Sequence, residues 1–287
     1  MTGRVSATVR IACCQLVPDV ENPSASAART RAALADALTA GAQIVLLPEL
    51  SASGYVFESA EEARALAQPA DGPLLSSWVR EAARGDAVVI GGFCELADDG
   101  RVFNSAALLD GGGVRAVYRK LHLWDREPLW FSRGEHPAPV VPTRFGQIGL
   151  GVCYDIEFPE LTRGLALAGA QLIALPTNWP REQRPSDDPA PMLRALALST
   201  AYLSRVYVAV CDRGGAERGL AFQGGSVIAA PDGVALAQAH GAESEQLLLA
   251  DVDLGAALDK RNGPANDAFA DRRAECYLSA LAHAAAE

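Results

Sequence analysis

The sequence lacks the features that mark several large classes of protein. No uncharged apolar run approaches the roughly 20 residues that a membrane-spanning helix needs, and no long apolar region follows residues 1–8, as it would in a secretion signal. No run of Lys and Arg offers a track for phosphates, and a formal net charge of -10 disfavours nucleic acid as a partner. We therefore expect a cytoplasmic protein that binds neither a membrane nor nucleic acid.

Metal-binding and disulfide patterns are also missing. The four histidines match no zinc spacing, and the six cysteines include no CxxC pair. Most of the cysteines lie in apolar runs, where Cys usually behaves as a small buried hydrophobic residue, and a disulfide framework is not expected in a cytoplasmic chain of this length. We expect no metal and no cofactor, and core packing is the default interpretation of any one cysteine.

Lysine is scarce, since it occurs only at Lys120 and Lys260 among 25 Lys and Arg residues. Where Arg is so strongly preferred, a retained Lys is a weak indication that the site needs a compact ammonium group in place of a planar guanidinium. The rest of the composition, 49% hydrophobic and 21% charged over 287 residues, is typical of a globular protein.

The residue pattern predicts alternating strands and helices. We expect strands over residues 10–17, 44–47, 87–94, 104–109, 114–119, 148–152, 172–175, 206–211, 225–230, 234–238 and 246–252. We expect helices over residues 22–40, 60–68, 73–84, 160–168, 192–204 and 254–260, and a polar loop over 179–191. No Gly/Ser-rich linker divides the chain. We therefore predict one α/β domain over residues 1–287, with its core at about 9–260, a C-terminal tail at about 261–287, helices outside and two stacked sheets inside.

An internal repeat supports this architecture. The segments 40–49 and 168–177 both begin with Ala-Gly-Ala-Gln and both carry Leu-Pro before the last residue, and each follows a predicted strand and helix. Two related β-α-β halves would bring their strand ends to one edge, where open α/β sheets bind ligands. Chance similarity of two helix-to-strand turns is the alternative.

Three reactive side chains stand where predicted strands end. Glu49, Lys120 and Cys153 could serve as base, positive group and nucleophile in an attack on an amide carbon. Cys153 also precedes a predicted helix start at residues 158–160, where a thiolate can be stabilised. The alternatives for the three residues are a capping carboxylate, a solvated ammonium and a core cysteine, respectively.

The residues around these three positions resemble known motifs. Leu47-Pro-Glu-Leu-Ser-Ala-Ser-Gly-Tyr55, Tyr118-Arg-Lys-Leu-His-Leu-Trp124 and Gly151-Val-Cys-Tyr-Asp-Ile-Glu-Phe-Pro-Glu160 look like the three signature blocks of the nitrilase superfamily of carbon–nitrogen hydrolases, in the family's order. The likeness extends over about residues 9–278. It implies a four-layer α-β-β-α sandwich that is usually assembled as a homodimer or a higher homo-oligomer.

The resemblance also implies roles for individual residues. Cys153 would be the nucleophile, Glu49 the general base, and Lys120 the group that stabilises the oxyanion together with the backbone N–H of Tyr154. Glu127 matches the family's additional glutamate, which helps to orient the site, although a solvated loop carboxylate is the alternative. A small-molecule amide would be hydrolysed to a carboxylic acid and ammonia through a cysteine thioester. If the two glutamates lie close together, we expect the pKa of at least one to be raised.

The residues after the nucleophile resemble amidases of aliphatic and ω-amino amides more than nitrilases, which usually have Trp-Glu after the cysteine. Hydrolysis of small aliphatic nitriles, hydrolysis of N-carbamoyl amides and a catalytically silent binding or scaffold role are the alternatives. One departure is that Leu203-Ser204 stands where many relatives have Glu-Asn, so hydrogen bonds from that Glu must be replaced or absent.

Aromatic and amide side chains flank the reactive strand ends. They predict a compact, largely apolar substrate pocket that excludes water, built from Tyr55, Trp124, Tyr154, Asn178 and Trp179, with Trp130 as a further candidate. The alternative for the tryptophans is packing in the core or in a dimer interface.

Overall fold

A computed structural model of the chain describes residues 8–181 and 191–277. Its two large sheets have six strands each, in the orders β14-β1-β2-β3-β4-β5 and β13-β12-β9-β8-β7-β6. The first sheet consists of β1 (Val9–Gln15), β2 (Ile44–Leu46), β3 (Val88–Leu96), β4 (Val102–Asp110), β5 (Gly113–Arg119) and β14 (Gln246–Val252). The second consists of β6 (Val140–Thr143), β7 (Gly146–Leu150), β8 (Leu172–Pro176), β9 (Tyr207–Cys211), β12 (Val227–Ala229) and β13 (Ala235–Gln238).

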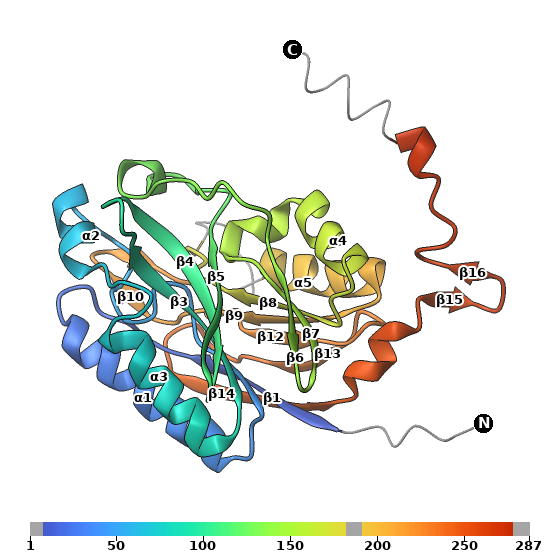
Figure 1. Cartoon of the computed structure of the whole chain (residues 1–287), viewed down its shortest axis with the longest axis horizontal. Coiled ribbons are helices and arrows are strands. Elements are labelled where there is room, and N and C mark those ends of the chain that lie inside the picture. Colours follow the sequence, from blue (N-terminus) through green and yellow to red (C-terminus); the bar gives the residue numbers. More distant parts are fainter. Residues whose placement is uncertain (1–7, 182–190, 278–287) are drawn as a thin grey trace.

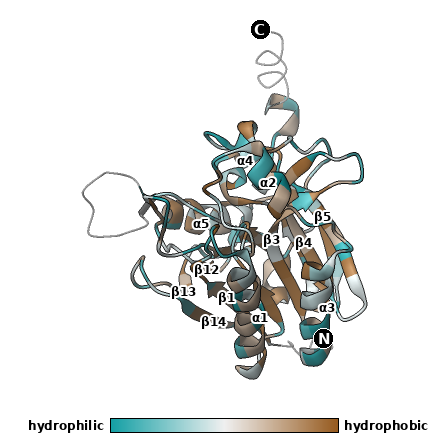
Figure 2. Ribbon diagram, turned by 90° about the vertical axis from the view of Figure 1, so that its left-hand side faces the viewer, coloured by the Kyte–Doolittle hydropathy of each residue, from teal (hydrophilic) through white to brown (hydrophobic). Residues whose placement is uncertain are grey.

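The two sheets pack face to face between two layers of helices (Figure 1). The helices are α1 (Pro23–Thr39), α2 (Ala60–Leu66), α3 (Pro73–Gly85), α4 (Pro159–Leu167) and α5 (Pro191–Ser204). Strand β2 shows how the layers form, because Ile44 and Leu46 face the core between the sheets while Val45 faces the cluster beneath α1 and α3. Figure 2 shows hydrophobic residues gathered on the strands between the helices. The predicted four-layer α-β-β-α sandwich is therefore confirmed.

The internal repeat corresponds to two structurally equivalent halves. Strands β1, β2 and β3 are parallel neighbours in one sheet, and β7, β8 and β9 are parallel neighbours in the other. The repeated segments connect α1 to β2 and α4 to β8. They also meet at their ends, because the backbone N–H of Glu49 donates to the carbonyl of Thr177 at 3.4 Å. The carboxyl ends of the strands in the two halves thus meet beside Glu49.

Several local predictions differ from the structure. Residues 254–260 do not form an α-helix but a short 3-10 helix, η3 (Leu254–Leu258), whose first turn is capped when the Asp253 side chain accepts from Gly255 N–H. The sequence pattern missed β6 and two short strand pairs, β10 (Ala216–Glu217) with β11 (Leu220–Ala221) and β15 (Arg261–Gly263) with β16 (Asn266–Asp267). Most of the predicted loop 179–191 lies outside the described residues.

The chain beyond η3 extends away from the sandwich (Figure 1). Phe269 attaches it to the sandwich. Arg163 Cζ of α4 lies 4.6 Å from the centroid of the Phe269 ring, and Lys260 Nζ lies 4.7 Å from it. No helix in the described ranges combines the length and the apolar character needed to cross a membrane.

Candidate active site

Three charged side chains meet in the interior at the edge where the strands end. Lys120 directly follows β5, and its Nζ donates to Glu49 Oε1 at 2.7 Å and to Glu127 Oε1 at 2.8 Å. The side chains of Lys120 and Glu49 are 0% exposed, and that of Glu127 is 3% exposed. Burial alone would lower the pKa of Lys120, but the two carboxylates outweigh it and raise this pKa well above its ordinary value. The ammonium therefore stays charged between two buried acids.

Glu49 has one occupied and one free oxygen. Its Oε1 accepts from Lys120 and from Asn104 Nδ2, the latter at 2.7 Å, while its buried Oε2 has no hydrogen-bond partner among the described residues. Burial is the largest influence and raises the pKa of Glu49, Lys120 lowers it, and Glu127 raises it further. The expected effect of the neighbouring carboxylate is therefore present, although desolvation is the larger cause.

Glu127 begins the 3-10 helix η1 (Glu127–Leu129) and is buried, so it is not a solvated loop carboxylate. In addition to Lys120, its Oε1 accepts from the Tyr55 hydroxyl at 2.8 Å, and its Oε2 accepts from Trp124 N–H at 3.1 Å. Tyr55 is itself buried and contacts this carboxylate. The pair connects the loop after β2 with the loop after β5.

Cys153 begins the 3-10 helix η2 (Cys153–Glu157) in a left-handed backbone conformation, with φ 47°. Its thiol lies 3.8 Å from the carbonyl oxygen of Asn178, to which it donates. Burial and then Glu49 raise the pKa of Cys153 well above its ordinary value, although Lys120 lowers it. The predicted helix start is confirmed, since α4 begins at Pro159, but the expected stabilised thiolate is not, because burial raises the pKa of Cys153. The resting group is a thiol that needs a base.

Cys153 lines a cavity of about 480 Å³. The other lining residues are Trp124, Tyr154, Glu157, Trp179, Pro180, Arg181 and Leu220. Three of the five predicted pocket residues therefore line the cavity, and its walls are aromatic as expected. Glu157 and Arg181 make it less apolar than predicted.

The remaining pocket candidates, Tyr55, Asn178 and Trp130, do not line this cavity. Asn178 is fully buried, is not among the lining residues, and has both side-chain amide atoms without a partner among the described residues. Trp130 packs against the hydrophobic cluster that contains Tyr55, and Arg126 lies over its ring at 5.4 Å from the centroid.

Two buried carboxylates that sequence reasoning missed hold the surrounding loops. Asp212 accepts from the backbone N–H of Trp179 at 2.9 Å, and burial raises the pKa of Asp212 to about 7. Glu217 accepts from Tyr55 N–H and Val56 N–H, both at 2.7 Å. No local signal identifies either one, since their partners lie 33 and more than 160 residues away in sequence.

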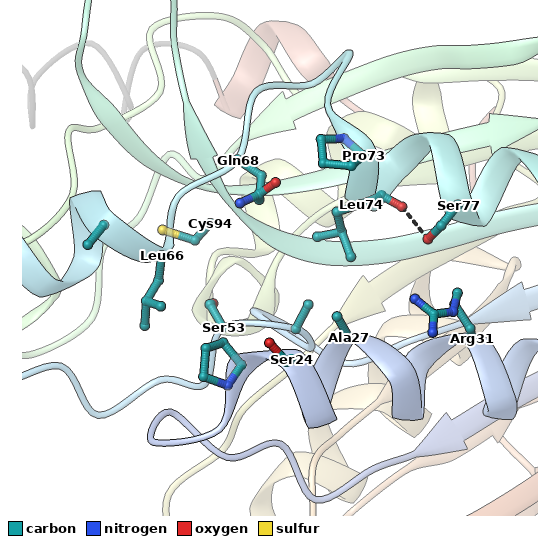
Figure 3. Close-up of a pocket in the computed structure, with 13 residues that line it drawn as sticks. Ser24, Ala27, Arg31, Ser53, Leu66, Gln68, Pro73, Leu74, Ser77 and Cys94 are labelled. Carbon is teal, nitrogen blue, oxygen red and sulfur yellow. Dashed lines mark hydrogen bonds between the residues drawn. The ribbon is translucent and has the colours of Figure 1, made fainter.

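A second cavity, of about 350 Å³, lies between α1, α2 and α3, and Figure 3 shows Ser53, Arg31 and Cys94 on its walls. The Cys94 thiol donates to the carbonyl of Ala63, and no reactive residue of the Glu49 cluster lines this cavity. The chemistry is therefore assigned to the cavity at Cys153. Among the described residues, no group of three or more His, Cys, Asp and Glu side chains could hold a metal ion.

Cations bond the backbone around the Leu203-Ser204 departure. Arg163 Nη1 donates to the Leu203 carbonyl at 2.7 Å, and Lys260 Nζ donates to the Arg205 carbonyl at 2.8 Å. The two lysines of the chain thus have different roles, since Lys120 bonds two carboxylates and Lys260 bonds the backbone.

Comparison with known proteins identifies the family of the chain. Residues 10–261 match the family model described as carbon-nitrogen hydrolase. This chain belongs to the carbon–nitrogen hydrolase family. The hydrolase is 35% identical to a protein named nitrilase from Pyrococcus abyssi, covering 94% of this chain and 99% of that one. It is 32% identical to an (R)-stereoselective amidase from Pseudomonas sp., covering 73% of each.

Solved structures show the same relationship. A mutant of the amidase from Nesterenkonia sp. AN1, with the acetamide moiety of fluoroacetamide covalently added at the active site cysteine, is 30% identical to this hydrolase. The similarity has a TM-score of 0.76 and covers 96% of this chain and 98% of that one.

Proposed function

We propose that this carbon–nitrogen hydrolase converts a small-molecule amide and water into a carboxylic acid and ammonia, through a thioester on Cys153 and without a cofactor. The observation that carries the proposal is the buried set of Glu49, Lys120 and Glu127, which interacts electrostatically with a cysteine that opens into an aromatic cavity. The Nesterenkonia amidase with an acetamide group on its cysteine supports the choice of nucleophile.

In the first half-reaction, Glu49 accepts the thiol proton of Cys153 while the sulfur attacks the amide carbon. As the C–S bond forms, an electron pair moves to the carbonyl oxygen, and the Lys120 ammonium and the backbone N–H of Tyr154 stabilise that oxyanion. The C–N bond then breaks, the leaving nitrogen takes the proton from Glu49, and ammonia departs.

In the second half-reaction, water gives a proton to Glu49 and attacks the thioester carbon. The C–S bond breaks, the carboxylic acid is released, and the sulfur of Cys153 regains the proton from Glu49. The buried Oε2 of Glu49, which has no partner among the described residues, suits a group that must accept and return a proton in each half-reaction.

The remaining candidates act on the substrate or its surroundings. Trp124, Tyr154 and Trp179 would contact the acyl group from the cavity wall. Tyr55 would hold Glu127 in place through its hydroxyl. Asn178 would help to position the amide near the sulfur. Its backbone carbonyl accepts from the Cys153 thiol, and its buried side-chain amide has no hydrogen-bond partner among the described residues.

Nitrile hydrolysis is the second candidate, because the Pyrococcus abyssi relative is named nitrilase and the same thiol could attack a C≡N carbon. Assays of ammonia release from short aliphatic, ω-amino and N-carbamoyl amides and from the matching nitriles will separate the alternatives. We expect the highest kcat/KM on an amide. A nitrile preferred over its matching amide would contradict the proposal.

Variants test the mechanism on the best substrate. Cys153→Ala should abolish turnover, whereas Cys94→Ala, which alters a buried thiol that bonds the Ala63 carbonyl, should retain it. Full activity in Cys153→Ala would refute the mechanism, and turnover of no tested substrate by the wild type would favour a catalytically silent member.

We also expect a homodimer or a larger homo-oligomer. Large apolar side chains are exposed near the end of α5 and on the turn between β12 and β13, where Leu203 is 64% exposed and Val234 is 55% exposed. The two sites adjoin, because a Cβ added at Gly233 would lie 3.0 Å from Tyr202 Cβ. An exposed apolar patch of this kind is typical of a surface that another subunit covers.

A further inference from the structure

A buried carboxylate that the mechanism above does not use lies two residues after the nucleophile. Asp155 is fully buried in η2, and its two oxygens accept four hydrogen bonds. Oδ2 accepts from Val152 N–H and from the Tyr118 hydroxyl, both at 2.9 Å. Oδ1 contacts His122 Nδ1 at 2.7 Å and accepts from His122 N–H at 3.3 Å. Since a carboxylate only accepts, Nδ1 carries the hydrogen of that contact.

The donors to Asp155 come from the two segments that carry Lys120 and Cys153. Tyr118 and His122 stand on either side of Lys120 in the sequence, and Val152 directly precedes Cys153. One buried group therefore joins the segment that carries the ammonium to the turn that carries the thiol. Those two segments come from different sheets, because β5 belongs to the first sheet and β7 to the second.

An aromatic contact reinforces the same connection. The His122 ring stacks on Phe158 with the ring centroids 3.6 Å apart and an interplanar angle of 8°. Phe158 in turn meets the edge of Tyr154, which lines the active-site cavity, at 5.0 Å. The Lys120 segment therefore also supports one wall of the cavity.

We propose that Asp155 is a positioning residue, whose carboxylate holds the turn that carries Cys153 against the segment that carries Lys120, so that thiol and ammonium keep their relative positions. The inference rests on the proposed function, because it assigns that arrangement to the hydrolytic reaction. An Asn at this position offers one acceptor oxygen and one NH₂ group, so at least two of the four donors would lose their acceptor. The two segments would then shift relative to each other.

The test compares Asp155→Asn with wild type in three measurements: kcat and KM on the best amide, thermal stability, and the rate of Cys153 alkylation by iodoacetamide as a function of pH, followed by peptide mass. We expect kcat to fall about 10²-fold, the loss typical of a small misplacement of a reacting group, with KM changed by less than about threefold. Because Lys120 lowers the pKa of Cys153, separating the two should move the alkylation profile to higher pH.

Graded variants keep the proposal testable if Asp155→Asn does not fold. Tyr118→Phe removes one donor and should lower kcat by less than Asp155→Asn does. His122→Asn keeps a donor near the position of Nδ1, whereas His122→Phe keeps the stacking on Phe158 and loses the donor. We expect the Asn variant to remain nearer to wild type in kcat and in the alkylation profile. The reverse order would assign the effect to stacking and overturn the proposal.

A destabilised control separates positioning from general stability. Thr30→Val removes the acceptor of the Trp78 indole N–H, a 3.0 Å hydrogen bond between α1 and α3, and should lower Tm while leaving kcat and the alkylation profile unchanged. If Asp155→Asn behaves like this control, Asp155 is only structural and the proposal fails. If the wild type hydrolyses no amide but Asp155→Asn still displaces the alkylation profile, the proposed function fails while the positioning role stands.

Discussion

The buried ion cluster makes a quantitative prediction for Lys120→Met. Met keeps the length and apolar volume of the side chain, so the main change is loss of the ammonium that bonds both Glu49 and Glu127. Removal of one member of a buried ion pair typically costs about 3–5 kcal/mol, because an uncompensated charge stays in the interior. All three side chains are at most 3% exposed, so solvent cannot replace the lost partner. We expect a loss in this range at about pH 8.

The loss should depend on pH, because Glu49 can take up a proton. Without Lys120, which lowers the pKa of Glu49, the folded-state pKa rises further above the unfolded value. A carboxylic acid whose pKa is raised in the folded state favours folding most at pH values below its unfolded-state pKa, where it is protonated in both states. This contribution to the free energy of unfolding is lost as the pH rises through the folded-state pKa. Lys120→Met should therefore be less destabilising at about pH 5 than at about pH 8.

Lys260→Met is the matched control, since Lys260 Nζ donates to a backbone carbonyl and burial lowers its pKa to about 8. Its removal should cost about 0.5–1.5 kcal/mol and vary little between about pH 5 and 7, where Lys260 is protonated in both states. The assay is denaturant unfolding at fixed protein concentration, with Glu49→Gln/Lys120→Met as the third variant. The double variant should lose less stability than Lys120→Met. An equal loss at both pH values, unrelieved by Glu49→Gln, would refute the reasoning.

Two further predictions concern backbone packing and assembly. A Cβ at Gly92 would overlap the backbone of Glu49, so Gly92→Ala should lower kcat by about 10²-fold. Gly164→Ala in α4 is the control and should retain full activity, because a Cβ there meets nothing within 4 Å. Equal kinetics in the two variants would contradict this prediction. Light scattering after size exclusion should show a homodimer or a larger assembly. The double variant Leu203→Glu/Val234→Glu should shift the assembly toward monomer, because it places charges on the exposed apolar patch. A wild type that is monomeric at all concentrations would contradict the expected interface.

The candidate reactive residues could be predicted from the sequence because strand ends are visible in a linear pattern and the residues around them resemble known motifs. Glu49, Lys120 and Cys153 each follow a predicted strand, and strands that run in the same direction end at a common edge. The repeated segments likewise predicted two related halves, and in the structure their ends meet where the backbone N–H of Glu49 donates to the Thr177 carbonyl. Regular periodicity also located most strands and helices. It failed for residues 254–260, where capping within a very short segment produced a 3-10 helix.

The supporting contacts could not be read from the sequence, because their partners lie far apart along the chain. Asn104 bonds Glu49 across 55 residues, and Glu217 bonds the backbone of Tyr55 across 162. Asp155 looks like any acidic residue near a helix start until the packed sheets bring Tyr118 and His122 to it.

The residue types at the site, and hence the acid, cation and thiol available to it, were determined by the sequence alone. Their protonation was decided only by the tertiary structure. A helix start near Cys153 suggested a stabilised thiolate, yet burial raises the pKa of Cys153 and of Glu49, and the two carboxylates keep Lys120 charged. Desolvation and charge proximity depend on how the two sheets pack against each other, and no local pattern of residues encodes either one.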